Sequence, residues 1–133
     1  MEKEKIEKEE FLLKLSSLEE EANKTQEQIS LVNQNIQDFE ILKTSIKNIE
    51  GNKDILTSLG KGVFIKTEIK EKELFVNVGA GVVLKKSPSE TFSIIEKQIK
   101  NLKEVKEELI KEIEKINKNL LVLIEEAKKQ NQV

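Results

Sequence analysis

The chain has 133 residues, of which 36% are charged and 4% aromatic, with a formal net charge of −2. It contains neither Cys nor His, so thiol chemistry, disulfides, the commonest metal ligands and the usual neutral-pH general base are absent, which argues against an enzyme and against a metal or cofactor. Opposite charges are interleaved and no apolar run is long enough to cross a membrane, so we expect neither nucleic acid nor membrane as a partner. Residues 1–5 are unlike a signal peptide, and we expect a cytoplasmic location.

Residues 1–50 predict a long helix that pairs with another helix. Apolar or small residues recur at alternating steps of four and three from Phe11 to Phe39. A repeat of 3.5 residues keeps one apolar stripe facing a partner helix, which is typical of a coiled coil.

The end of this helix is less regular. Near Lys43 the repeat is interrupted, which predicts a local change in the supercoil. We expect the stripe to resume in a shifted phase at Leu42, Ile46 and Ile49. Gly51 and Asn52 then predict the helix end, because glycine readily takes the left-handed conformation that follows many helices.

In residues 51–87 the apolar period changes from 3.5 to 2, which indicates strands. We expect four of them, at about residues 55–59, 63–69, 74–78 and 82–85. Two G-x-G segments, Gly60-Lys61-Gly62 and Gly79-Ala80-Gly81, would close them into two successive β-hairpins. The first segment lacks the spacing of a phosphate-binding loop and precedes a strand, so a hairpin turn is the favoured interpretation.

Two hairpins without a core to pack on are marginal by themselves, and their edges invite pairing with other chains. We therefore predict that the strands form an oligomer interface. One apolar face would carry it, made of Val63, Ile65, Ile69, Leu74, Val76, Val78, Val82 and Leu84. The opposite face mixes Phe64, Phe75 and Val83 with polar residues.

Residues 88–133 predict a second helix with a sharp start. In Ser87-Pro88-Ser89-Glu90 a serine stands at the N-cap, proline at the first helical position and glutamate at the third, which is a capping box. The same heptad repeat then runs from Phe92 to Ala127, with Lys106 in one seam position. Lys106 either sets the register or extends outward while Val105 fills the seam. An antiparallel pairing of the two helices would bring Phe11 near Ala127.

The predicted fold is α+β: a long antiparallel α-helical coiled coil with two central β-hairpins that join an oligomeric β-barrel. This order resembles the α-class subunit of prefoldin, and is most similar to the archaeal form. The resemblance rests on Leu59-Gly60-Lys61-Gly62-Val63-Phe64-Ile65-Lys66 and on Val76-Asn77-Val78-Gly79-Ala80-Gly81-Val82-Val83-Leu84-Lys85-Lys86. It covers nearly the whole chain and implies one prefoldin-like domain over residues 1–133.

The resemblance also implies a function and partners. A chaperone subunit of this family is expected to join two α-class with four β-class subunits, to capture unfolded polypeptides at the coil tips without ATP, and to pass them to a group II chaperonin. Two other functions stay open: a coiled-coil scaffold that binds a particular folded partner, and an α-like paralogue that self-assembles into filaments.

Clusters of apolar residues near both chain ends fit binding at the tips. The predicted client-contact residues are Phe11, Leu12, Leu13, Leu120, Leu121, Leu123 and Ile124. Several of them fall outside the strict seam, and exposed clustered apolar surface usually marks an interaction site. The alternative is that Leu12, Leu13, Leu121 and Ile124 widen the seam and pack within the coil.

Overall fold

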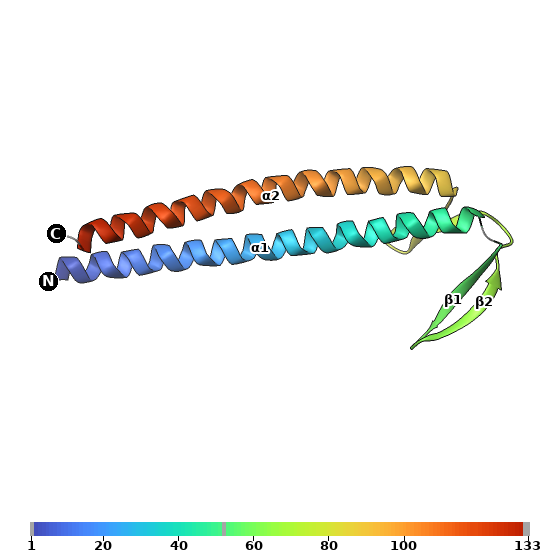
Figure 1. Ribbon diagram of the computed structural model, residues 1–133, viewed down its shortest axis with the longest axis horizontal. Helices are drawn as coiled ribbons and strands as arrows, with labels where there is room; N and C mark the ends of the chain where they lie inside the picture. The colour runs from blue at the N-terminus through green and yellow to red at the C-terminus, as the bar shows by residue number, and fades with distance from the viewer. Residues whose placement is uncertain (1, 52, 132–133) are drawn as a thin grey trace. The chain divides into compact units, whose positions relative to one another are not determined.

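The computed structural model describes residues 2–51 and 53–131 as two long helices and two β-hairpins (Figure 1). The elements are α1 (Glu2–Gly51), β1 (Asp54–Gly60), β2 (Val63–Glu68), β3 (Leu74–Gly79), β4 (Val82–Lys86) and α2 (Pro88–Asn131). The predicted helix–hairpin–hairpin–helix order is confirmed. The chain divides into two compact units, one formed by residues through Asn35 with those from Leu102 onward, the other by Ile36–Asn101.

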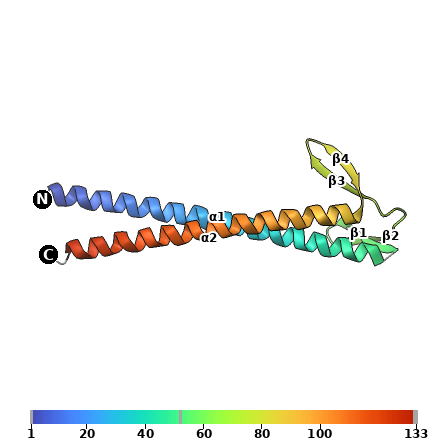
Figure 2. The same ribbon diagram turned by 90° about the horizontal axis from the view of Figure 1, so that it is seen from above.

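The first unit is a two-helix coiled coil. The first part of α1 and the last part of α2 run side by side in opposite directions (Figures 1 and 2). Phe11 and Ala127 line one groove, as the antiparallel pairing predicts. Seam residues Thr25, Ile29 and Ile116 are buried, so the 3.5-residue stripe is the contact surface between the helices.

The core of the second unit lies where the end of α1 meets the start of α2. Ile46 and Ile95 are each only 3% exposed, and with Ile99 they form one buried cluster. Leu74 of β3 packs against this cluster, as do Ile36 and Phe39 of α1. A hairpin is therefore fixed to the coil by at least one of its own apolar side chains.

The predicted shifted stripe near Lys43 is right at Ile46, which is buried, and at Ile49, which is half-buried, but wrong at Leu42. The half-buried or buried positions run from Phe39 to Lys43, Ile46 and Ile49, in steps of four, three and three. Leu42, expected in the seam, is 44% exposed. Lysine can occupy a seam position because its aliphatic stem packs in the seam while its ammonium group reaches the edge.

Lys106 also lies in the seam, at a half-buried position of α2. Val105 is exposed, so it does not fill the seam in place of Lys106. Of the two interpretations, the one in which Val105 replaces the lysine is therefore wrong.

The two helix boundaries next to the hairpins had different outcomes. The predicted start of α2 at Pro88 is confirmed, and the backbone N–H of Glu90 donates to Ser87 Oγ at 3.1 Å. The α1 helix ends at Gly51, where the stop was predicted, but Gly51 is helical and not left-handed, so the predicted conformation of this residue is wrong. Asn52, the other half of that prediction, lies outside the described residues.

Each hairpin is a separate two-stranded antiparallel sheet closed by a two-residue turn. Both central residues of each turn have positive φ, 49° and 79° at Lys61 and Gly62, 51° and 76° at Ala80 and Gly81. This is the type I′ geometry, whose twist matches that of the paired strands. It explains why each loop ends in glycine.

A bulge precedes each turn, and both bulges are built alike. The register shifts between Ser58 and Gly60 in β1, and between Asn77 and Gly79 in β3. The N–H of Gly60 donates to Ser58 Oγ at 3.3 Å, and that of Gly79 donates to Asn77 Oδ1 at 3.0 Å. The second hairpin therefore repeats the first in detail, including the polar side chain that supports the bulge.

Candidate functional site

Within residues 2–51 and 53–131, no group of three or more acidic, His or Cys side chains is placed to hold a metal ion. In the same residues, no helix is both long and apolar enough to span a bilayer. The features that call for a functional explanation are instead apolar side chains that the fold leaves exposed.

The predicted client-contact residues fall into two groups in the first unit. Phe11, Leu120 and Leu123 are half-buried seam residues of the coil. The other four, Leu12, Leu13, Leu121 and Ile124, are exposed. The first group holds the helices together, and the second is accessible to another molecule.

The helix geometry explains this division. Each residue advances by about 100° around a helix, so Leu13 points about 200° away from the seam residue Phe11. Leu13 is 72% exposed, and Leu121 on α2 is 62% exposed. Neither side chain can widen the seam from these positions. The alternative in which all four residues pack within the coil is therefore wrong for these two leucines.

The structure also brings the two ends together through a shared groove. Leu18 and Lys14 of α1 line it opposite Val122 and Leu123 of α2. Val122 is exposed, and it was absent from the predicted contact set although it directly precedes Leu123. Its place beside the groove adds apolar surface between the two helices. Ile6, one more exposed apolar residue, lies two turns before Leu13 on the same face of α1.

The predicted interface strands are largely exposed in the single chain. Side chains of Val63, Ile65, Val78, Val82 and Leu84 are exposed, whereas Ile69, Leu74 and Val76 are half-buried. Paired strand positions place Val76 opposite Leu84 on one face of the second hairpin. Val78 lies in the bulge and Ile69 lies beyond β2, so these two do not continue the strand alternation.

The opposite faces of the hairpins are apolar as well. Leu56 and Phe64 are exposed on the first hairpin, and Phe75 and Val83 on the second. Lys85 covers Phe75 in part, with its ammonium nitrogen 5.5 Å from the ring centroid. A two-stranded sheet with apolar side chains on both faces needs cover on both faces. The sequence pattern had suggested one interface face, and the exposed aromatic rings are the signal that points to a second.

The geometry defines a class of protein: a coiled-coil subunit whose two helices are joined through two β-hairpins. A family model described as "Prefoldin subunit" matches residues 18–132. Since this is most of the chain, the chain belongs to the prefoldin subunit family.

Individual relatives agree with this assignment. The chain is 31% identical to "Prefoldin subunit alpha" of Methanosphaera stadtmanae over 85 residues, 62% of either chain. It is 34% identical to "Prefoldin subunit alpha 1" of Thermococcus kodakarensis over 98 residues, 65% of this chain and 67% of that one. The first of these matches thus spans less than two thirds of the relative. The predicted similarity to the archaeal α-class subunit is confirmed.

A solved structure shows the same fold. The chain aligns with filamentous PFD from Methanocaldococcus jannaschii with a TM-score of 0.55 and 18% identity, over 89% of this chain and 95% of that one. At this identity the likeness concerns the arrangement of helices and hairpins alone.

Proposed function

We propose that the chain is the α-class subunit of a cytoplasmic, ATP-independent chaperone that captures unfolded polypeptides at the ends of its coiled coil. The observation that carries this proposal is the exposure of Leu13 and Leu121, on the outward faces of both helices and near both chain ends. Unfolded chains expose apolar segments, and burial of apolar surface is non-directional, so such a site binds many sequences.

The size of the apolar site argues for several coils acting together. Complete burial of one leucine side chain contributes about 1.5–3 kcal/mol. Two leucines therefore supply at most about 3–6 kcal/mol before the cost of association, which leaves a dissociation constant of about 1 mM or weaker. A client held by several tips at once would bind far more tightly through the raised effective concentration.

The hairpins would bring several coiled coils into one complex, so that several tips can hold the same client. In the proposed complex, two copies of this chain join four β-class subunits, and the apolar hairpin faces pack into a β-barrel. Val63, Ile65, Val82 and Leu84 would lie in this interface, since they are apolar and exposed in the single chain. The captured polypeptide would then pass to a group II chaperonin.

The test is reconstitution with the β-class subunit from the same source. Light scattering should give a closed complex with the mass of two such chains and four partners. That complex should slow the aggregation of at least two unrelated unfolded proteins, equally well with and without ATP. Failure to protect either protein would refute the chaperone function. A large homo-oligomer that ignores the β-class subunit would favour the scaffold or filament alternative.

A further inference from the structure

The regular heptad repeat leaves one question about the coil open: what fixes the register of α1 against α2. Residues that recur every seven positions can mesh equally well after a slip of seven residues, because apolar side chains again face apolar side chains. A slip of one heptad displaces one helix by about 10 Å along the other. A polar seam residue can remove this degeneracy if it finds its partner in one register only.

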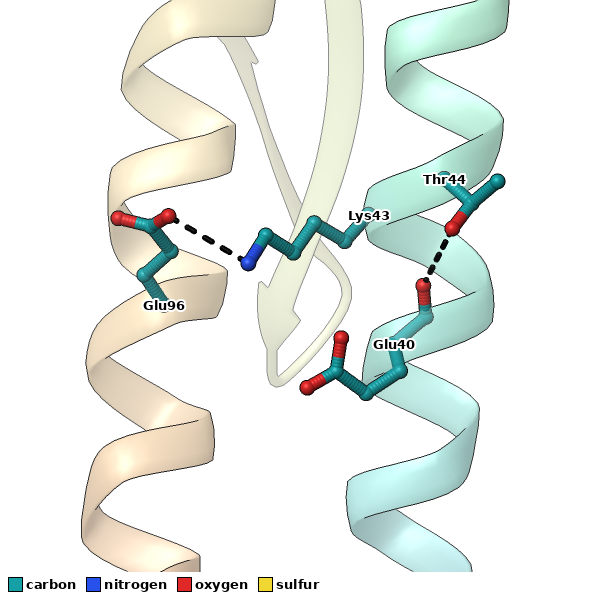
Figure 3. Close-up of polar contacts among 4 residues, drawn as sticks. All are labelled: Glu40, Lys43, Thr44 and Glu96. Atoms are coloured by element: carbon teal, nitrogen blue, oxygen red, sulfur yellow. Dashed lines mark hydrogen bonds and ion pairs between the residues drawn. The ribbon is translucent and has the colours of Figure 1, made fainter.

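Lys43 has such a partner in the second unit. Its side chain is 24% exposed, and its Nζ lies 3.4 Å from Glu96 Oε1 across the helix pair (Figure 3). The same nitrogen lies 5.1 Å from the centroid of the Phe92 ring. A second cation, Lys47 Nζ, lies 5.2 Å from that ring. Lys43 thus joins one carboxylate and one aromatic ring, both on α2.

The sequence of α2 supplies this pair in one register. A slip of one heptad in one direction would replace Glu96 by Lys103 and Phe92 by Ile99. The lysine would then face another lysine. A slip in the other direction would replace Glu96 by Ser89 and would leave no helical residue in place of Phe92, since α2 begins at Pro88. In both cases the ammonium group at the edge of the seam loses its ion-pair partner, and in the first case it also meets a like charge.

The same residue also disfavours a wrong partner. Two α1 helices paired in parallel and in register would place Lys43 against its own copy in the seam. The two like charges would repel each other across the helix pair.

We propose that Lys43, through Glu96 and Phe92, sets the register of the helix pair next to the hairpins. Lys43 is thus a positioning residue, and the strength of the coil comes from its isoleucine neighbours. Ile46 and Ile95 bury the apolar surface of this unit, but their type recurs along both helices and does not distinguish one register from another.

Distances between two spin labels test this proposal on the full-length chain. Because the chain has no cysteine, E50C and S89C introduce the only two attachment sites. These residues line one groove between α1 and α2 in the observed register, together with Phe92. The chain that carries E50C and S89C but keeps Lys43 should give a single distance between the two labels. K43L should add a second population with a longer distance between the labels. It would come from molecules in which one helix has moved by about 10 Å along the other.

Three further variants complete the design. E96K should also produce the second population, since it places two lysines together, and the charge reversal K43E/E96K should restore one distance. K106L is the matched control: Lys106 also lies half-buried in the seam, but no ion pair of it is seen in the described residues. It should keep one distance. A single, unchanged distance in K43L, or equal heterogeneity in K106L, would overturn the proposal.

Discussion

The exposed leucines at the chain ends make the sharpest test of how stability and function are divided in this coil. We consider the double substitution Leu13→Gln and Leu121→Gln. Glutamine has nearly the helix propensity of leucine, so the backbone is little affected. The change removes apolar surface from the outward faces of both helices and leaves the seam as it is.

The expected effect on folding follows from the exposure of each side chain. Leu13 is 72% and Leu121 62% exposed, so folding buries only about a third of either side chain. With about 1.5–3 kcal/mol for complete burial, each substitution should lower the free energy of unfolding by roughly 0.5–1 kcal/mol. By contrast, Ile116→Ala in the buried seam should cost about 2–5 kcal/mol.

Two measurements separate the roles. Urea unfolding followed by circular dichroism gives the free energy of unfolding, and the aggregation assay with the assembled complex gives client capture. The double variant should fold and assemble but protect unfolded proteins poorly. Leu31→Gln is the matched control, because Leu31 is 62% exposed, as Leu121 is, but lies far along α1 from Leu13.

The reasoning is refuted if the double variant is destabilised as strongly as Ile116→Ala, since the leucines would then belong to the coil. Unchanged protection by a complex that carries the double variant would refute the tip site itself. A loss of protection in Leu31→Gln of the same size would show that any exposed leucine on the coil contributes.

Three other predictions concern the hairpins and their junction with α2. Ser87→Ala should lower the free energy of unfolding by about 0.5–2 kcal/mol in thermal or urea melts, because the N–H of Glu90 loses its cap; Ser89→Ala, without that bond, should have a smaller effect. Gly81→Ala places a Cβ at φ 76°, which should destabilise the chain by about 1–2 kcal/mol in the same melts. Val76→Asp should leave the helical circular dichroism signal intact but abolish assembly with the β-class subunit in light scattering; a complex of normal mass would contradict the proposed interface.

Local signals in the sequence were enough to predict the elements. The cap at Ser87 and Pro88 depends on residues adjacent in the chain, and the structure places the start of α2 there. The G-x-G turns are local in the same sense, because their positive φ values demand glycine at the second turn position. The bulges were not predicted, since a bulge depends on the register between two strands.

The error at Lys43 has a different cause. A sequence pattern assigns charged residues to the outside, so Leu42 was expected in the seam in place of its neighbour. In the structure, Lys43 and not Leu42 lies in the seam. Lys43 contacts Glu96 and Phe92, which are distant in sequence and lie on the other helix. Such a pair cannot be found until the register is known, and the heptad repeat alone does not give the register.

The distribution of buried residues links folding to assembly. The buried apolar residues are Ile29, Ile46, Ile95, Ile99 and Ile116, all of them in the two helices. The hairpins leave apolar side chains exposed on both faces, and among the described strand residues it is Leu74 that packs against the core cluster. In the proposed complex, the apolar faces of the strands would gain most of their burial from contacts with other chains. A partner that binds the folded hairpins adds its binding free energy to their stability. The hairpins of the free chain should accordingly exchange their amide hydrogens much faster than those of the assembled complex, while seam residues around Ile95 change little. Equal protection of the strands in both states would mean that the hairpins are stable by themselves, and would remove this physical reason for assembly.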